Sequence, residues 1–418
     1  MTARRVRIIG AGLAGLSAAV ELAAAGYGVD LSEAGPRAGG RCRSYLDPQL
    51  GLTIDNGNHL VLSGNSAVHA YLDRVGAGGR VAGPPDARFG FVDLVTGDRF
   101  TVRPNDGPLP WWIFAKGRRV PGTRAGDYLR LTRLLRPPPG ATVGDVVPTC
   151  GPLWERLIEP VLLAALNTPA AEASAGLASA VIRETLAKGG QAYRPQVAVP
   201  TLAAAFVDPA LDYLSARGAT VRFGRRLTAL RVGDEQLREL VFADGIEPVA
   251  EDEAVILAVP APVAATLLPG LPVPTEFAAI VSLHFAVTPP AHAPAMLGVL
   301  GGTSEWIFTF PDRISVTISA ADRLVDADRE ALAGAIWAEV AVALDIAAPL
   351  PPWQVVKERR ATFAATVAQD ALRPPAATRW RNLSLAGDWT QTGLPATIEG
   401  AVRSGVAAAG LAIMTARL

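Results

Sequence analysis

Near the start of the chain, two short apolar runs flank a longer segment rich in alanine and leucine. Residues 6–9 and 29–31 have the length and apolar character of buried strands, and residues 13–25 predict a helix between them. A strand, a helix and a second strand in this order predict a βαβ unit, which extends to about Ser44. The pattern therefore favours an α/β fold.

Further elements follow in separated blocks. Apolar patterning predicts helices over residues 126–136, 153–167, 177–188, 201–218, 326–344 and 398–415. Runs of strand length fall at 220–223, 254–259, 281–287, 305–310, 314–319 and 383–385. We expect a nucleotide-binding domain assembled from residues 1–65, 201–260 and 375–418, and a discontinuous α+β substrate domain formed by residues 66–200 and 261–374.

The turn after the first predicted strand carries a glycine signature. Gly10 permits the sharp turn, Gly12 lets a pyrophosphate approach the backbone, and Gly15 lets the helix pack closely on the strand. Glu33 follows the second strand, 18 residues after Gly15, where an acid can bond a ribose hydroxyl. The unpaired N–H groups at the helix start favour phosphate. The loop predicts dinucleotide binding; the alternative is a glycine-rich turn in an ordinary α/β protein.

Composition narrows the class of protein. The 418 residues are 50% hydrophobic and 19% charged, with a formal net charge of zero, which argues against a nucleic-acid partner. The 2 cysteines and 4 histidines show no metal-ligand spacing, so a metal-free cytoplasmic protein is the simplest interpretation. Residues 254–275 are the longest uncharged run and contain several prolines, which forbid a continuous membrane-spanning helix.

Three dispersed segments point to one superfamily. Residues 10–34, the GGRCRS segment at 39–44 and LAGDWTQTGLPATIEGAVRSG at 385–405 resemble the FAD-binding elements of the amine oxidase and phytoene desaturase superfamily. The resemblance implies a Rossmann-type, glutathione-reductase-like FAD-binding domain, and makes FAD the expected cofactor rather than NAD. A departure is Ser32 before Glu33, where the superfamily usually has an apolar residue.

The same resemblance implies a set of cofactor contacts. The glycine loop would hold the pyrophosphate, Glu33 and its neighbour the ribose, the GGR segment the flavin edge, one backbone segment the adenine, and the last two segments the ribityl chain and flavin O2. The residues are Gly10, Gly12, Leu13, Ala14, Gly15, Glu33, Ala34, Gly40, Arg41, Gly57, Asn58, Leu227, Gly387, Asp388, Leu394, Pro395 and Ala396. Arg41 could instead form a surface ion pair, and Asp388 could be a turn cap.

Within the superfamily, the chain most resembles the hydroxysqualene dehydroxylase family. Residues 39–65, 109–123, 166–170 and 387–405 carry this likeness, which spans nearly the whole chain. It implies reductive removal of an allylic hydroxyl from hydroxysqualene, with a hydride from reduced flavin N5 reaching an allylic cation. A carotenoid-type desaturase, which removes hydride on the same fold, is the alternative. A non-catalytic isoprenoid-binding escort protein is a third possibility, and an amine oxidase is disfavoured because the paired aromatic signature is missing.

The proton donor is not defined by the motifs. Asp55, His59 and Glu399 are the candidate catalytic residues, since a buried carboxyl can stay protonated at neutral pH. His59 could equally be structural. His284 sits in an apolar strand and could point into the cavity, and Trp306, Phe308, Phe310 and Trp389 could offer aromatic faces to a cation or simply fill the core.

The implied substrate is a C30 isoprenoid, which must be collected from a membrane or from an upstream synthase. At ~0.8 kcal/mol per carbon, such a chain gains on the order of 20 kcal/mol on leaving water. Trp111 and Trp112, within an aromatic segment followed by Lys116, Arg118 and Arg119, have the composition of a peripheral membrane contact. The alternative is a lid or core patch of the substrate domain.

Overall fold

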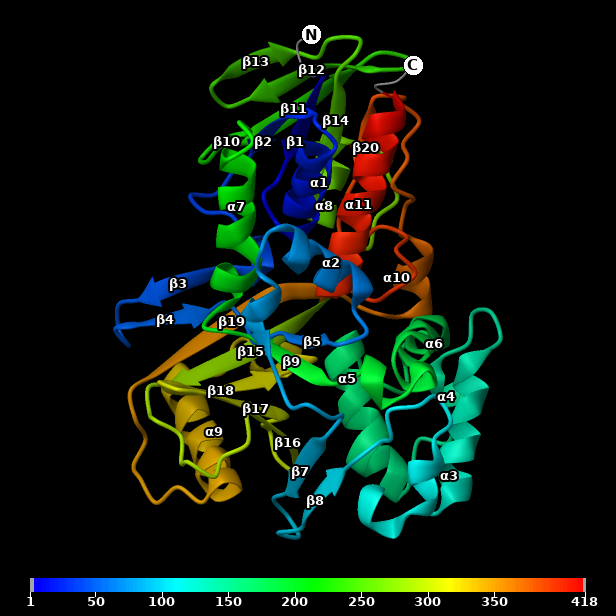
Figure 1. Ribbon diagram of the computed structural model, residues 1–418, viewed down its shortest axis with the longest axis vertical. Coiled ribbons are helices and arrows are strands. Elements are labelled where there is room, and N and C mark those ends of the chain that lie inside the picture. The colour runs from blue at the N-terminus through cyan, green and yellow to red at the C-terminus, as the bar shows by residue number, and fades with distance from the viewer. Residues whose placement is uncertain (1–3, 416–418) are drawn as a thin grey trace.

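The computed structural model describes residues 4–415, which form two large sheets with helices around them (Figure 1). One sheet lies in the upper half of the view with both described chain ends near it, and the other lies in the lower half. The polypeptide passes between the two halves several times, so each half contains segments that are distant in sequence.

The upper sheet has five parallel strands in the order β10-β2-β1-β14-β20. Their bounds are Arg5–Ile9 (β1), Gly28–Ser32 (β2), Thr220–Arg222 (β10), Ala254–Leu257 (β14) and Leu383–Leu385 (β20). Central strands of a parallel sheet are buried on both faces, which explains why β14 is a continuous apolar run and why Val6, Ile8 and Ile9 of β1 are buried. The sheet draws its strands from three separated parts of the chain.

Two helices pack against each other beside this sheet, α1 (Leu13–Ala24) and α11 (Ile398–Thr415). They approach so closely that a Cβ on Gly405 of α11 would lie 2.3 Å from the carbonyl oxygen of Ala14 in α1. A glycine at this position is therefore what brings the end of the chain against its beginning.

The lower sheet has seven strands in the order β19-β15-β18-β17-β16-β7-β8. Their bounds are Phe89–Asp93 (β7), Arg99–Val102 (β8), Phe277–Phe285 (β15), Met296–Leu300 (β16), Trp306–Phe310 (β17), Arg313–Ile318 (β18) and Trp353–Phe363 (β19). All neighbours are antiparallel except β16 and β7, which run parallel. Helix α9 (Arg329–Leu344) packs on one face through a continuous apolar cluster.

The remaining strands form three small sheets. They are β3 (Ser44–Asp47) with β4 (Leu52–Asp55); β5 (Leu60–Leu62), β9 (Pro195–Ala198) and β6 (Val81–Ala82); and β11 (Leu227–Val232), β12 (Leu237–Phe242) and β13 (Gly245–Pro248). The other helices are α2 (Ser66–Arg74), α3 (Ala125–Arg130), α4 (Val143–Val146), α5 (Glu159–Leu166), α6 (Ala175–Glu184), α7 (Asp208–Ser215), α8 (Ala261–Leu267) and α10 (Val367–Ala371).

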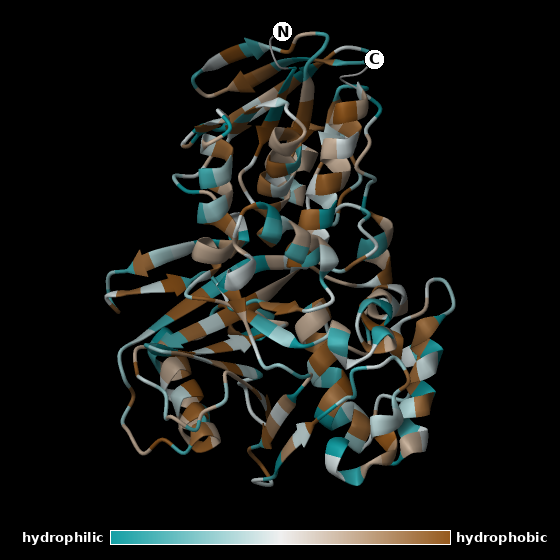
Figure 2. Cartoon of the chain, viewed as in Figure 1, coloured by the Kyte–Doolittle hydropathy of each residue, from teal (hydrophilic) through white to brown (hydrophobic). Residues whose placement is uncertain are grey.

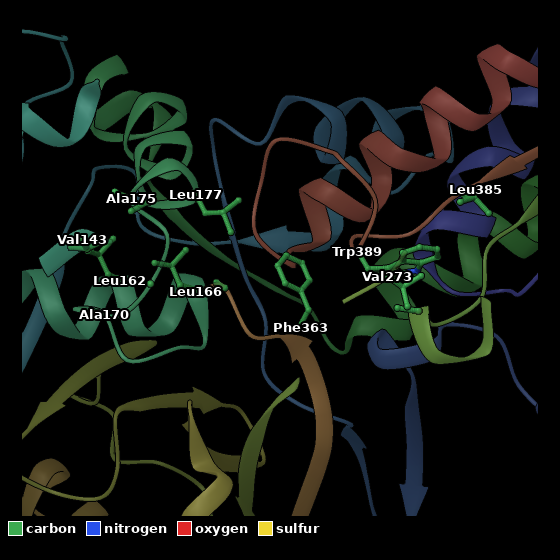
Figure 3. Packing of buried hydrophobic residues seen from close by; sticks show 14 of the residues in the cluster. Val143, Leu162, Leu166, Ala170, Ala175, Leu177, Val273, Phe363, Leu385 and Trp389 are labelled. Carbon is green, nitrogen blue, oxygen red and sulfur yellow. The ribbon is translucent and has the colours of Figure 1, made fainter. Parts of the chain in front are cut away.

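Hydrophobic burial joins these parts. The helices around both sheets carry brown apolar residues as well as teal polar ones (Figure 2). One buried cluster extends from α4, α5 and α6 to β20, with Phe363 lying between Leu177 on one side and Trp389 on the other (Figure 3). The helical region of residues 125–184 therefore shares a core with the sheet that carries the glycine loop.

Several expected elements differ from the structure. The helix predicted over 201–218 contains a π-helical turn, η9 (Ala203–Val207), before α7 begins. The strands β7, β8 and β19 were not predicted, although they complete both sides of the seven-stranded sheet. β19 carries Lys357, Glu358, Arg359 and Arg360 in succession, and such a charged run hides the alternation that identifies a strand.

Candidate active site

The glycine loop between β1 and α1 is shaped by contacts on one side and left open on the other. Gly10 has a φ of +106°, and a Cβ on Gly15 would lie 1.9 Å from the Gly10 carbonyl oxygen. These two glycines are therefore required by the turn itself. A Cβ on Gly12 would meet no atom within 4 Å, so the protein leaves free space beside this backbone, at the start of α1.

The second glycine pair lies directly against this loop. The Gly39 N–H donates to the Ala11 carbonyl at 2.8 Å, and a Cβ on Gly40 would lie 3.3 Å from the Gly12 Cα. The Arg41 guanidinium bonds the Asp388 carboxylate at 2.7 Å. Arg41 thus pairs with a buried carboxylate rather than in a surface ion pair, and this pair joins the GGR segment to the segment after β20.

Glu33 faces the same loop. Its carboxylate accepts the Ala11 N–H at 2.8 Å and the Gly35 N–H at 2.7 Å. The Arg225 N–H donates to the Glu33 carbonyl at 2.8 Å, which places the segment that leads into buried Leu227 alongside the acid and Ala34. The expected ribose and adenine residues are therefore neighbours.

The segment after β20 is held by a buried arginine that the sequence analysis did not identify. Arg373 donates to the carbonyl oxygens of Asp388, at 3.1 Å, and Thr390. Asp388 is itself buried, and the Gly387 N–H donates to Ser404 Oγ of α11. Beyond it, buried Leu394 and Pro395 and half-buried Ala396 lead into α11.

The turn of residues 55–59 is docked on the seven-stranded sheet. The Asn56 Nδ2 donates to Glu358 at 3.2 Å, and the Asn58 Nδ2 donates to Thr317 Oγ1 at 3.0 Å. Between them, a Cβ on Gly57 would lie 3.5 Å from Ser282 Oγ. The turn therefore lies across β19, β15 and β18.

A small cavity of about 10 Å³ lies between this turn and the sheet. It is lined by Asp55, Asn58, His59, Val197, Ala198, Leu202, Phe308 and Phe310. One wall of this cavity, which has room for about one water molecule, is therefore polar and another is aromatic.

Asp55 is the buried carboxyl of this cavity. Its Oδ1 accepts from Ser44 Oγ at 2.6 Å and from the Leu202 N–H at 2.9 Å, and its Oδ2 lies 3.6 Å from Arg313. Burial raises the pKa of Asp55, although these hydrogen bonds and the Arg313 charge oppose the effect. Burial therefore favours the protonated form of this carboxyl, whereas its contacts favour the charged form.

Both histidines near the turn are neutral at physiological pH. Burial, and next the charge of Arg41, lowers the pKa of His59 to about 4. Burial and the charge of Arg313 lower the pKa of His284 to about 3, while its Nδ1 lies 2.8 Å from Ser315 Oγ. A neutral imidazole is a poor acid, so His59 does not suit the role of proton donor for which the sequence made it a candidate.

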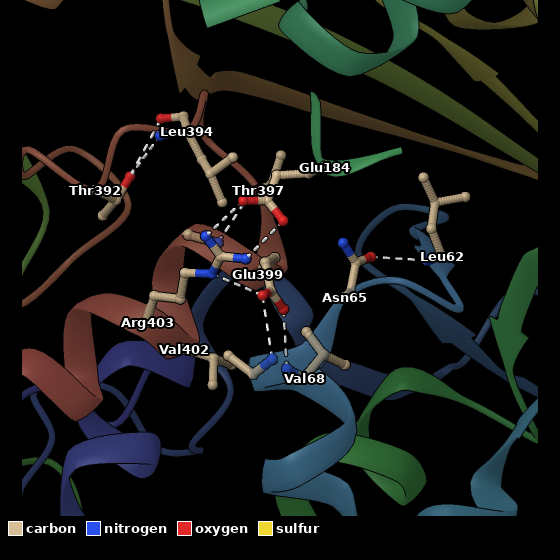
Figure 4. Close-up of polar contacts among 12 residues, drawn as sticks. Leu62, Asn65, Val68, Glu184, Thr392, Leu394, Thr397, Glu399, Val402 and Arg403 are labelled. Carbon is tan, nitrogen blue, oxygen red and sulfur yellow. Dashed lines mark hydrogen bonds and ion pairs between the residues drawn. The ribbon is translucent and has the colours of Figure 1, made fainter. Parts of the chain in front are cut away.

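Glu399 has a structural environment rather than a catalytic one (Figure 4). Its two carboxylate oxygens accept the N–H groups of Ala67 at 3.1 Å and Val68 at 2.9 Å, in the first turn of α2. Arg403 donates to the same carboxylate at 2.7 Å. With both oxygens occupied in this way, Glu399 joins α11 to α2, and this geometry does not favour its expected role as an acid.

The aromatic segment of residues 109–114 is only partly exposed. Trp111 is 53% exposed, whereas Trp112 is 7% exposed and packs edge-on against Tyr128. The expected pairing of Trp111 and Trp112 as a membrane contact is therefore wrong for Trp112. In the 3-10 helix η3 (Trp111–Phe114), Trp112 and Ile113 face the core, and Trp111 and Phe114 face outward. The exposed apolar neighbours of Trp111 are Leu109 and Phe114.

Ser282, Arg313, Ser315, Thr317 and Glu358 were missed in the sequence, although all contact the turn of residues 55–59 or its neighbours. A signal was present. Polar residues stand at every second position within the predicted strands 281–287 and 314–319, which marks one polar face on each strand.

Comparison with known proteins defines the class of this protein. The model of the family "Flavin containing amine oxidoreductase" matches residues 13–413, and the chain belongs to this family. It is therefore a flavin-dependent oxidoreductase, and its cofactor is FAD. The observed residues fit that group, because the open side of Gly12 and the adjoining Gly40 leave backbone accessible where a pyrophosphate would lie.

Curated relatives that match over nearly the full length share the name hydroxysqualene dehydroxylase. The chain is 53% identical over 415 residues to the hydroxysqualene dehydroxylase of Rhodopseudomonas palustris, covering 99% of both chains, and 54% identical to that of Sinorhizobium fredii, covering 98% of both. The zeta-carotene desaturase of Zea mays matches over only 73 residues, 18% of this chain. A putrescine oxidase triple mutant shares the fold, with a TM-score of 0.71, 16% identity and 99% coverage of both chains.

Between residues 4 and 415, no helix combines the length and apolar composition needed to cross a bilayer.

Proposed function

We propose that this protein removes the allylic hydroxyl of hydroxysqualene to give squalene. The observation that carries the proposal is the identity of 53% over 99% of both chains with a hydroxysqualene dehydroxylase. In the balanced reaction, the alcohol takes up one proton and one hydride, the C–O bond breaks, a C–H bond forms and water leaves. Reduced FAD would supply the hydride when bound.

The chain's own residues then have three tasks. The loop shaped by Gly10 and Gly15, together with Gly12, Gly40 and Asp388, would hold the cofactor. The sheet face bearing Phe308 and Phe310 forms an aromatic wall, and an acid delivers the proton. Exclusion of bulk water matters because water would recapture an allylic cation. Phe308 can also face the developing positive charge, whereas the Phe310 ring already carries the Arg313 guanidinium, 3.9 Å from its centroid.

We infer that Asp55 is the acid. It lines the cavity, it is buried, and its pKa is raised, whereas His59 is neutral and Glu399 is bound to α2 and Arg403. Glu305 is another buried carboxyl, and burial raises its pKa to about 7. Its carboxylate accepts the Ser319 N–H at 2.7 Å at the end of β18, and it is not among the residues that line the cavity.

The test is an anaerobic reaction of the purified protein with reduced FAD and hydroxysqualene. Squalene formed in equal amount to oxidised flavin supports the proposal. A dehydrogenated polyene formed only with oxidised FAD would indicate the desaturase alternative. Protein that purifies without flavin and cannot be loaded with it would indicate an escort protein.

The protein would collect its substrate at a membrane surface. Leu109, Trp111 and Phe114 are 78%, 53% and 69% exposed, and we name them the apolar triplet. Arg118 lies 4.9 Å from the Trp111 ring centroid. Residues 103–136 also include Arg103, Lys116, Arg119, Arg124, Arg130, Arg133 and Arg136, against the acids Asp106 and Asp127. Exposed aromatic and apolar residues within a segment rich in cations match an anionic lipid surface. Handover from an upstream synthase would be an additional source of substrate.

A further inference from the structure

The seven-stranded sheet presents two different faces. Val281, Leu283 and Phe285 of β15 join the cluster under α9, so Ser282 and His284 lie on the opposite face. The same alternation puts Ile314, Val316 and Ile318 of β18 under α9, and Arg313, Ser315 and Thr317 on the opposite face.

This second face changes character from one strand to the next. On β15 and β18 it is polar, with Ser282 paired opposite Thr317 and His284 opposite Ser315. On β17 it carries Trp306, Phe308 and Phe310, which belong to the other hydrophobic cluster. A polar strip therefore borders an aromatic strip on one continuous surface.

The polar strip contains hydrogen-bonding atoms that the protein does not use. Ser282 is 1% exposed, and its Oγ has no hydrogen-bond partner among residues 4–415. The Asn58 Nδ2 is bound to Thr317, while the Asn58 Oδ1 is buried without a partner. Ser282 and Thr317 are directly opposite on adjacent strands, and Gly57 stands over Ser282, so the two free groups lie beside each other.

We propose that Asn58 and Ser282 form the subsite that binds the hydroxyl of the substrate, with Thr317 positioning the Asn58 amide. The proposal rests on the proposed function, because it assigns the polar group of that alcohol. An alcohol can donate its proton to the Asn58 Oδ1 and accept from the Ser282 hydroxyl, which satisfies both free groups. The hydrocarbon chain would then lie along the aromatic strip.

This subsite would select the alcohol over the hydrocarbon product. Squalene offers no donor or acceptor, so it would leave the Asn58 and Ser282 groups unpaired in a buried place. A site built this way holds the substrate by its leaving group and releases the product once that group has departed as water.

The experiment measures binding of hydroxysqualene and of squalene to the FAD-loaded protein, by flavin absorbance in detergent of constant composition. For Ser282→Ala and Asn58→Leu, we expect the preference for the alcohol to fall about tenfold, with squalene binding unchanged. Thr317→Val should lower the preference and raise KM for hydroxysqualene, whereas Thr317→Ser, which keeps the hydroxyl, should restore both.

Ser384→Ala is the matched control, because Ser384 is also buried with an unpartnered hydroxyl but lies on β20 of the other sheet. It should keep the wild-type preference. If flavin-loaded Ser282→Ala and Asn58→Leu bind the alcohol as the wild type does, the subsite is wrong even where squalene is formed. A wild-type protein that makes no squalene overturns the proposed function instead.

Discussion

Gly12 and Gly15 belong to the same loop, but their surroundings differ at the level of single atoms. A Cβ on Gly15 would overlap the Gly10 carbonyl at 1.9 Å, whereas a Cβ on Gly12 would meet nothing within 4 Å. The fold therefore requires a glycine at position 15, whereas the space beside Gly12 stays free for the cofactor. Likewise, Asp55, His59 and His284 lie in one neighbourhood, but burial raises the pKa of Asp55 and lowers the pKa of both histidines.

Gly12→Ala should separate cofactor binding from folding. Gly12 has φ −71° and ψ 175°, which alanine adopts without strain, so we expect the apo-protein's free energy of unfolding to change by less than about 0.5 kcal/mol. FAD retention should fall about tenfold or more, because the methyl group occupies the approach of the pyrophosphate. Flavin absorbance per protein measures FAD retention, and melting of the apo-protein measures stability. If Gly12→Ala retains as much flavin as the wild type, the assignment of Gly12 to the cofactor is wrong.

Asp55→Asn should lower kcat by about a hundredfold or more, the usual contribution of a general acid. In the wild type, kcat should fall as pH rises, because Asp55 with its raised pKa then loses the proton it must deliver. The variant should lose that dependence. Glu305→Gln is the control, and its kcat should depend on pH as in the wild type. If Glu305→Gln loses this dependence and Asp55→Asn keeps it, Glu305 is the acid.

His284 should make the fold sensitive to acid. Its folded-state pKa of about 3 lies below its ordinary 6.5, so the unfolded chain takes up the proton first and stability is lost as pH falls below 6.5. The loss is about 1.4 kcal/mol per pH unit. Melting of His284→Gln should therefore show a shallower pH dependence, while His292→Gln, at an exposed position, should match the wild type. If the melting temperatures of the wild type, His284→Gln and His292→Gln depend on pH in the same way, this role of His284 is wrong.

At the scale of elements, the contact between α2 and α11 depends on one carboxylate. Glu399 bonds two N–H groups at the start of α2, which are unpaired within that helix, and its charge also suits the helix N-terminus. Arg403 completes the arrangement and also bonds Glu184 of α6. Three helices therefore meet at this group.

Glu399→Gln tests the structural role against the catalytic one. An amide keeps one acceptor oxygen but loses the charge, so the free energy of unfolding should fall by about 1–3 kcal/mol. Because the variant retains Asp55, kcat of the folded fraction should stay within about twofold of the wild type. Chemical denaturation and single-turnover flavin oxidation measure these two quantities. Unchanged stability with a hundredfold lower rate would restore Glu399 as an acid.

The sequence predicted these elements unevenly, for physical reasons. α11 begins and ends where its small-residue pattern predicted, and β1, β2 and β20 followed from apolar runs between glycines. β19 was missed because its charged run conceals its alternation. The glycine loop could be recognised from spacing. The alternation could mark a polar face on each strand separately, but not the strip, because Ser282 and Thr317 become neighbours only through strand pairing. The contacts that tie Glu399 to α2 and Arg403, and the burial that keeps His59 neutral, are likewise properties of the folded chain.

At the scale of the whole molecule, the five-stranded sheet that carries the glycine loop lies in the upper half of the view, and the apolar triplet lies in the lower half. In Figure 1, β13 is at the upper end and α3, which contacts η3, is near the lower end. A membrane contact through Leu109, Trp111 and Phe114 would direct the seven-stranded half toward lipid and leave the upper half in water.

Replacing the apolar triplet with serine should lower binding to vesicles that contain anionic lipid by on the order of tenfold or more, because exposed apolar area drives this binding. Vesicle flotation measures it. Ile246→Ser is the control, since Ile246 is 50% exposed on β13 at the opposite end of the molecule. Equal flotation of the triplet variant and the wild type would refute the contact.

The pairing of β14 with both β1 and β20 has a consequence for how the chain matures. β1 and β2 are made first, but β1 lacks its second neighbour until β14 emerges, and β14 lacks its own until β20 follows. The face of α1 that packs against α11 likewise stays uncovered until α11 is complete. Such long-range closure slows folding and leaves apolar surface exposed during synthesis. The chain must therefore be almost wholly synthesised before the cofactor can be enclosed, and free FAD at that moment would act as a folding partner.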